Sequence, residues 1–279
     1  MTLRRFASGA CKLALLGFVA VYLLAPLVVV VGASFGAPQT GGVVISYVEF
    51  PPRHFTLDWY RRISADTFRA LGLSIGLAGE AALIACALGV PAALGLVRGR
   101  MPGKAVIAAL FRAPLQIPAV VSGIAFLQLF YLVDDHAGTS LHGSFTGLLL
   151  AHVFLALPFV IGSVAAVLQR FDTRLEEAAR ILGATGWRAF RRVTLPLIMP
   201  GIVTGAIYGF LVSFIDVPVS LFLSGSGLVP YPVELFSAMQ QEISPTILAS
   251  ATLVVGFSLL LLLAVHRLVG LDALLRSSS

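Results

Sequence analysis

Three ionisable residues lie in stretches of this sequence that are otherwise apolar. Glu80, His152 and Asp216 are each flanked by runs of aliphatic, aromatic and small residues. Such groups are costly to place in hydrocarbon, and they usually face a protein interior or a water-filled path. A carboxylate in a path attracts cations, and carboxylates together with a histidine can relay protons. The chemistry to consider first is therefore the movement of a solute or an ion across a membrane.

Asp216 is open to two interpretations. It ends the run Ser213-Phe214-Ile215-Asp216, and Pro218 follows two residues later. In one interpretation Asp216, with Ser213 and Phe214, lines a transport path and attracts a cationic solute. In the other, its carboxylate accepts the free backbone N–H groups of a helix that breaks at Pro218.

The remaining candidates for a path carry similar alternatives. Glu80 contacts the solute, pairs with an arginine, or stays protonated through burial. His152 is either a histidine with satisfied hydrogen bonds or a ligand or proton relay. Gln128 and Tyr131, three residues apart in another apolar stretch, are further candidates for the lining of the path.

The elements that must position these residues are membrane helices. Of the 279 residues, 58% are hydrophobic and only 11% are charged, whereas a soluble domain has about 25% charged residues. A helix crosses the hydrocarbon core with about 20 apolar residues. Six stretches qualify, at residues 11–33, 70–97, 105–133, 145–168, 198–223 and 247–269. The sequence thus predicts an all-α membrane protein with six transmembrane helices in a single transmembrane domain over 1–279. The first stretch is predicted to be a retained anchor, with signal cleavage near Ala33 as the alternative.

Basic residues set the predicted orientation. If the N-terminus is cytoplasmic, 15 of the 19 Lys and Arg residues fall on the cytoplasmic side. This asymmetry is the positive-inside pattern, and it places both termini in the cytoplasm. The basic excess then faces lipid headgroups, so no nucleic-acid partner is expected. Cys11 and Cys86 lie in different apolar stretches, which supports neither a disulfide framework nor a zinc site.

Two outer segments and one inner segment connect the predicted spans with recognisable patterns. On the outside, residues 57–63 and 233–242 are predicted to form short helices. On the inside, residues 169–196 form the one extended polar loop. Asp172 is a suitable N-cap for a helix that Gly183 ends, and Thr185 can cap a second helix from Trp187 to about Arg192. Leu195-Pro196 is predicted to turn the chain back into the membrane.

The inner loop resembles a known motif. It reads Glu177-Ala178-Ala179, three residues, Gly183, nine residues, Val193, one residue and Leu195-Pro196. This arrangement is similar to the EAA loop of binding-protein-dependent ABC importer permeases, EAA-x3-G-x9-I-x-LP, with valine in place of isoleucine. The alternative is an amphipathic loop helix lying on the lipid surface.

The resemblance implies a fold, a mechanism and partners. The fold is that of a type I ABC importer permease in the cytoplasmic membrane of a prokaryote. The partners are two ATPase subunits, a second permease that is a different chain, and an extracytoplasmic solute-binding protein. The ATPases bind ATP and Mg²⁺ and drive alternating access. In this chain, Glu177 would contact the ATPase, Ala178 and Ala179 would pack closely, and Gly183 would form the bend, while Leu195 and Pro196 close the motif.

A weaker resemblance covers nearly the whole chain. Segments such as 157–160, 195–200 and 216–220 look like the second permease subunit of spermidine/putrescine-type importers. This resemblance favours a polyamine-like cation as the solute. Related permeases carry ferric iron, aminophosphonates, opines or other small solutes, and these stay open as alternatives.

Other function classes lack their motifs. The sequence has no GxxxxGK[ST] phosphate loop, HExxH, GxSxG or paired-cysteine site, so neither a catalytic residue nor a metal site is expected. An ion-driven carrier using Glu80, His152 and Asp216 is a more distant alternative, and the inverted repeats typical of such carriers are not apparent.

Overall fold

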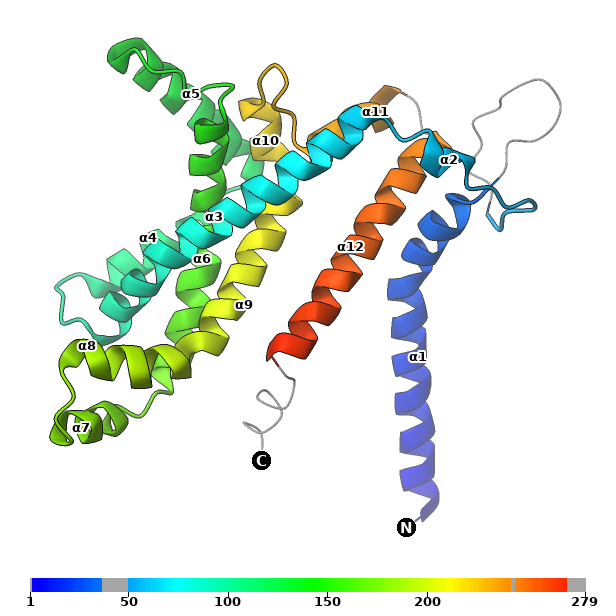
Figure 1. Ribbon diagram of the computed structural model, residues 1–279. Helices are drawn as coiled ribbons and strands as arrows, with labels where there is room; N and C mark the ends of the chain where they lie inside the picture. The colour runs from blue at the N-terminus through cyan, green and yellow to red at the C-terminus, as the bar shows by residue number, and fades with distance from the viewer. Residues whose placement is uncertain (1, 37–49, 242–243, 270–279) are drawn as a thin grey trace. The chain divides into compact units, whose positions relative to one another are not determined.

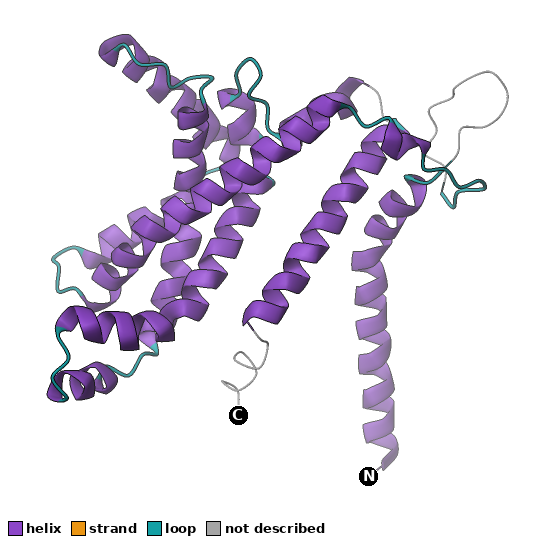
Figure 2. Cartoon of the chain, viewed as in Figure 1, coloured by secondary structure: helices purple, strands orange, loops and turns teal. Residues whose placement is uncertain are grey.

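The computed structural model describes residues 2–36, 50–241 and 244–269. In these ranges the regular elements are helices (Figures 1 and 2). The chain forms two compact units, one of residues 68–236 and the other of residues 1–67 with 237–279. The inner loop and the candidate path residues all belong to the unit 68–236.

The unit 68–236 contains most of the helices. They are α3 (Ala65–Arg98, beginning just before the unit), α4 (Lys104–Gln116), α5 (Ala119–Ala137), α6 (Phe145–Gln169), α7 (Arg174–Ile181), α8 (Gly186–Ala189), the π-helix η1 (Phe190–Thr194), α9 (Leu195–Phe214), α10 (Pro218–Leu223) and the start of α11 (Tyr231–Gln241).

Helices α6 and α9 pack closely along a row of glycines. Gly201, Gly205 and Gly209 recur every four residues on α9, so they share one face of the helix. A β-carbon at Gly205 would lie 2.7 Å from the Cα atom of Val160 on α6. Only glycine permits this separation of the two backbones. The core around this contact is formed by Ala85, Ala93, Ala156, Val160, Ile161, Val164, Leu168 and Ile198.

The predicted span at 105–133 is two helices in the structure. Helices α4 and α5 are bent by 104° at the short break between Gln116 and Ala119. Pro118 explains the break, because proline disfavours the helical conformation of the residue before it. Ile117 is accordingly extended, with φ −85° and ψ 129°.

The predicted span at 198–223 is also interrupted. Helix α9 ends at Phe214, and α10 begins at Pro218 after the break at residues 215–217. Proline is well suited to the first turn of a helix, where its missing N–H has no partner to lose. The chain therefore stops one helix and starts another at the position of Asp216.

The second unit contains α1 (Thr2–Ala33), α2 (Asp58–Arg61), the rest of α11 and α12 (Pro245–Val269). The short helix predicted at 57–63 is confirmed as α2, but its tryptophan is buried in protein. Trp59 packs with Ile63 and Ala249 and donates from Nε1 to the Gly36 carbonyl at 2.6 Å. Parts of the predicted outer loops and of the C-terminal tail, at 37–49, 242–243 and 270–279, lie outside the described residues.

Within the described residues, four helices are long and apolar enough to cross a membrane, or five if the bent α4–α5 pair counts as one span. Helix α12 contributes a shorter apolar stretch at Pro245–Leu260.

Candidate functional site

The inner loop begins with a helix whose end is shaped by a glycine. The Asp172 carboxylate accepts the Arg174 N–H at 3.0 Å at the start of α7. After α7, Gly183 adopts a φ of 87° in the left-handed region. The Gly183 N–H donates to the Arg180 carbonyl, and the Ala184 N–H donates to the Ala179 carbonyl. These two bonds form a Schellman motif, and Gly183 is the bend that the sequence predicts.

The second helix of the loop is continuous with a membrane helix. The Thr185 hydroxyl accepts the Arg188 N–H at 3.3 Å, which confirms Thr185 as the N-cap of α8. The helical path then runs without interruption from Gly186 to Phe214 through the π-helical turn η1. Leu195-Pro196 lies inside this run, with Pro196 in the first turn of α9, and does not make a separate turn.

The loop exposes large apolar side chains at its tip. Ile181 is 85% exposed, Leu182 is 87% exposed and Trp187 is 70% exposed. Glu177 and Ala178 are exposed as well, whereas Ala179 is half-buried. Trp187 stacks on Phe190 with 5.5 Å between the ring centroids, but most of its surface, like that of Ile181 and Leu182, stays uncovered by the described residues.

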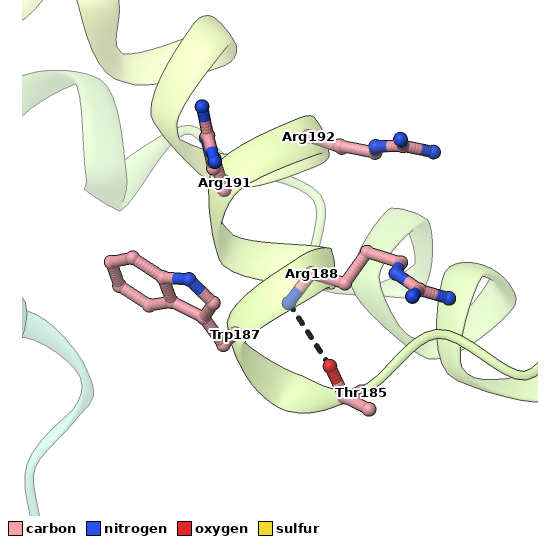
Figure 3. A pocket seen from close by; sticks show the side chains of 5 residues that line it. All are labelled: Thr185, Trp187, Arg188, Arg191 and Arg192. Carbon is pink, nitrogen blue, oxygen red and sulfur yellow. Dashed lines mark hydrogen bonds between the residues drawn. The ribbon is translucent and has the colours of Figure 1, made fainter.

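Three arginines flank Trp187 on the second helix of the loop. Thr185, Trp187, Arg188, Arg191 and Arg192 line an open hollow of about 460 Å³. Figure 3 shows Trp187 on one side of the helix, with Arg188 and Arg192 pointing to the other. Their guanidinium groups have no ion-pair partner in the part of the chain that the structure describes. The loop thus presents unpaired positive charge beside an exposed aromatic ring.

A partly buried cluster at the base of the loop involves residues that sequence reasoning missed. Arg98 Nη1, at the end of α3, donates to Glu176 Oε1 on α7 at 2.7 Å. The Thr194 hydroxyl donates to the same oxygen. Burial raises the pKa of the Glu176 carboxyl, but the hydrogen bonds from Thr194 and Arg98 and the Arg98 charge outweigh it, so the pKa is below the usual value.

The predicted path residues fall into two groups. The first is a buried hydrogen-bonded chain in which His152 Nδ1 lies 2.7 Å from Ser213 Oγ and His152 Nε2 lies 3.0 Å from Ser220 Oγ. Asp216 Oδ2 accepts the Ser220 N–H at 2.8 Å and the Ser220 hydroxyl at 3.1 Å. This network joins α6 to both sides of the α9–α10 break. Phe214 is buried beside it and stacks on Phe210.

The second group is exposed on the surface of the unit. Glu80 lies on α3, and Gln128 and Tyr131 lie on α5. Tyr131 stacks on His142 with 4.8 Å between the ring centroids. Glu80 makes no hydrogen bond or ion pair with the described residues. No hydrogen bond or ion pair joins Glu80 to Asp216 in the described part of the chain.

The missed residues left a weak signal in the sequence. Glu176 and Ala179, three residues apart, are the half-buried positions of α7, opposite its exposed residues. A glutamate on the buried face of an amphipathic helix requires a hydrogen-bonding partner. That partner is Arg98, which lies 78 residues earlier in the chain. No local sequence pattern indicates that the two residues meet.

Comparisons with known proteins agree with this geometry. Residues 85–271 match the family described as binding-protein-dependent transport system inner membrane component. The chain is 35% identical over 245 residues to the putrescine transport system permease protein PotI of Escherichia coli K12, covering 87% of this chain and 84% of that protein. It is 33% identical over 242 residues to the spermidine/putrescine transport system permease protein PotC of Haemophilus influenzae, covering 86% and 89% respectively.

Solved structures show the same fold at lower identity. A bacterial ABC transporter involved in the import of the acidic polysaccharide alginate matches with a TM-score of 0.68 and 20% identity, over 96% of this chain and 97% of the other. The MetNI methionine ABC transporter, in inward-facing conformations, matches with a TM-score of 0.57 and 20% identity, over 77% and 98%. The chain therefore belongs to the family of binding-protein-dependent transport system inner membrane components, and it is a permease subunit of an ABC importer.

Proposed function

We propose that residues 169–196 are the docking site for an ATPase subunit. The observation that carries this proposal is the exposed apolar tip formed by Ile181, Leu182 and Trp187. Exposed apolar surface rimmed by polar residues marks an interaction site. The rim includes Glu177 and the three arginines around Trp187, and the arginines suit an acidic surface on the ATPase.

The motif residues have distinct roles in this proposal. Glu177, which is exposed, makes a polar contact with the ATPase. Ala178 and Ala179 allow the backbone of the loop to approach the ATPase closely. Gly183 holds the bend between the two loop helices. Leu195 and Pro196 begin α9, so the second loop helix and the membrane helix move as one element.

The assembly around this chain follows from the class of importer. We propose two ATPase subunits, a second permease of different sequence and an extracytoplasmic solute-binding protein, in the cytoplasmic membrane of a prokaryote. Both termini of this chain are cytoplasmic, and residues 11–33, 70–97, 105–133, 145–168, 198–223 and 247–269 cross the membrane. ATP and Mg²⁺ are bound by the ATPases, whose closure drives alternating access.

Replacement of Leu182 with aspartate tests the docking site. The charge would have to be buried without a partner at the interface, so we expect the ATPase to be lost when the chain is purified in mild detergent. Leu57→Asp is the matched control, because Leu57 is also an exposed leucine but belongs to the predicted outer segment. An ATPase that stays bound to Leu182→Asp contradicts the docking assignment.

We propose that the solute is a polyamine-like cation. The support is the similarity to PotI and PotC, together with Glu80. Its carboxylate is exposed on a helix apolar enough to cross a membrane. An intramembrane carboxylate is expected to face a water-filled path, where Glu80 would attract a cation, and Gln128 and Tyr131 are proposed to line the same path.

Asp216, Ser213 and Phe214 have a different place in this proposal. Asp216 accepts two hydrogen bonds from Ser220, and its exposure is only 7%. These contacts favour the alternative in which Asp216 satisfies the start of α10. We therefore propose that these three residues shape the wall of the path at the helix break.

Labelled putrescine uptake by the complete transporter tests the solute assignment. Glu80→Gln removes one charge at nearly constant shape, and we expect its KM for putrescine to rise. Asp135→Asn is the control, because Asp135 is an exposed carboxylate at the end of α5. If the unmodified transporter and the Asp135→Asn control do not take up putrescine but take up an aminophosphonate or ferric iron, the solute is one of the alternatives.

A further inference from the structure

A single carboxylate oxygen joins three elements at the base of the inner loop. Glu176 Oε1, on α7, accepts hydrogen bonds from Arg98 Nη1 at 2.7 Å and from the Thr194 hydroxyl. Arg98 is the last residue of α3, and Thr194 is the last residue of η1, where α9 begins. The first helix of the loop is therefore attached to two separate membrane helices through one atom.

The surroundings of this junction shield it from water. The Arg98 guanidinium lies over the Phe171 ring at 4.8 Å from the centroid, and Phe171 belongs to the segment that joins α6 to α7. The Arg98 side chain is 28% exposed, the Glu176 side chain is 15% exposed and Thr194 is fully buried. Ion pairs at the open surface contribute little, whereas partly buried pairs with extra hydrogen bonds are harder to break.

The connectivity of the chain makes the Arg98–Glu176 contact important for α3. Helix α9 follows α8 without a break, so a displacement of the loop reaches α9 through the backbone. Helix α3 has no such route, because α4, α5 and α6 lie between it and α7 in the chain. A direct side-chain link is thus the short connection between α7 and α3.

We propose that Arg98, Glu176 and Thr194 form a clamp that transmits the movement of α7 to α3 and α9 together. The clamp rests on the proposed function, in which the loop containing α7 docks on the ATPase. Because α3 also carries Glu80, movement at the docking site reaches a proposed path residue through this clamp. Arg98, Glu176 and Thr194 are positioning residues and touch neither ATP nor solute.

One nitrogen of the clamp donates no hydrogen bond within the described ranges of the chain. Arg98 Nη2 is enclosed and has no acceptor among the described residues. A buried donor without a partner costs free energy.

The test compares coupling with docking in the complete transporter, with this chain purified together with its partner subunits and placed in liposomes. ATP hydrolysis and solute uptake are measured in parallel for Arg98→Gln, Glu176→Gln and the double variant. Arg100→Gln is the matched control, because Arg100 is an exposed arginine two residues beyond Arg98. Arg98→Lys keeps the charge but replaces the planar guanidinium with one compact ammonium group, and it carries the test if the glutamine variants fail to insert.

We expect the ATPase to co-purify with every variant. Uptake per ATP hydrolysed should fall by about tenfold in each glutamine variant, within the usual range of coupling between two sites. The double variant should be no worse than the poorer single variant, since both substitutions break the same contact. Arg98→Lys should retain part of the coupling, and Arg100→Gln should match the unmodified chain.

Three outcomes overturn the clamp. The first is equal coupling in Arg98→Gln and Arg100→Gln. The second is a double variant whose loss is the product of the single losses, which means that the two residues act independently. The third is loss of the ATPase from Glu176→Gln, which places Glu176 in the docking surface. Failure of the unmodified chain to bind any ATPase refutes the proposed function itself, and the clamp with it.

Discussion

Replacing Gly205 with alanine tests the contact that holds α6 and α9 together. A β-carbon at position 205 would lie 2.7 Å from the Val160 Cα atom and 3.4 Å from the Phe159 carbonyl oxygen. Carbon atoms that are not bonded rest roughly 3.5–4.0 Å apart, so α9 must move away from α6 by about 1 Å. The nearest atom belongs to the backbone, and a change of side-chain rotamer therefore cannot relieve the clash.

The size of the effect follows from two opposing contributions. Overpacking a close contact costs about 1–3 kcal/mol. Alanine recovers about 0.5–1 kcal/mol over glycine within a helix, because glycine loses more backbone freedom on folding. The net destabilisation then lies between roughly 0 and 2.5 kcal/mol, with a middle value of about 1 kcal/mol. Gly162→Ala on α6 is the matched control, since a β-carbon there meets no atom within 4 Å, and only the helix-favouring contribution applies.

The assay is the temperature at which the purified chain in detergent loses its monodisperse peak on size exclusion. Gly205→Ala should lower this temperature by several degrees, because about 1 kcal/mol shifts the midpoint of a chain near this size by roughly 2–4 °C. Gly162→Ala should leave it unchanged or raise it. If both variants behave alike, the close approach of α6 and α9 at Gly205 is refuted.

Three further predictions concern the loop and the helix break. The pKa of Glu176 is below its usual value. Its stabilising contribution is therefore fully present above the ordinary glutamate pKa and is lost as the pH falls through the lowered pKa. Thermal scans from neutral to acid pH should show a smaller loss of thermal stability in Glu176→Gln than in the unmodified chain. Gly183→Ala should destabilise the loop by about 1–2 kcal/mol, because the backbone at residue 183 is in the left-handed conformation. Gly186→Ala should not destabilise it, and the rates of amide hydrogen exchange in the loop distinguish the two variants. Ser220→Ala removes the hydroxyl that bonds both His152 Nε2 and Asp216 Oδ2, and it should cost about 1–3 kcal/mol in thermal stability. No loss would show that these two hydrogen bonds do not stabilise the fold.

The inner loop is the part that local sequence reasoning predicts in most detail. Gly183 ends a helix because the left-handed conformation there is open to glycine, and Thr185 starts one because its hydroxyl accepts a free N–H. Both are rules about neighbours in sequence. The turn predicted at Leu195-Pro196 is wrong, because Pro196 lies in the first turn of α9, where proline is tolerated, and α9 follows the π-helical turn η1 directly. The π-helical turn before it has no local signature.

The helix breaks show how hydrophobicity hides backbone geometry. The stretches 105–133 and 198–223 are apolar throughout, so they predict continuous spans, and hydropathy does not register whether the backbone within them is continuous. Pro118 and Pro218 carried the missing information, because a proline restricts the residue before it and removes a donor. Prolines also lie inside α6 and α9 without ending them, at Pro158 and Pro200. A proline alone therefore does not tell a break from an uninterrupted helix.

Asp216 and Glu80 look alike in sequence, and their separation depends on what the fold places around them. Ser220 follows Asp216 by four residues. The Asp216 carboxylate accepts hydrogen bonds from the Ser220 N–H and hydroxyl. Aspartate shortly before a proline that starts a helix is a capping pattern. The contact between Asp216 and Ser220 could therefore be predicted from the sequence. His152 is 68 residues from Ser220, and only tertiary structure brings them together. Glu80 has no such neighbours among the described residues, and a carboxylate left unpaired by its own chain is the better candidate to meet a cationic solute.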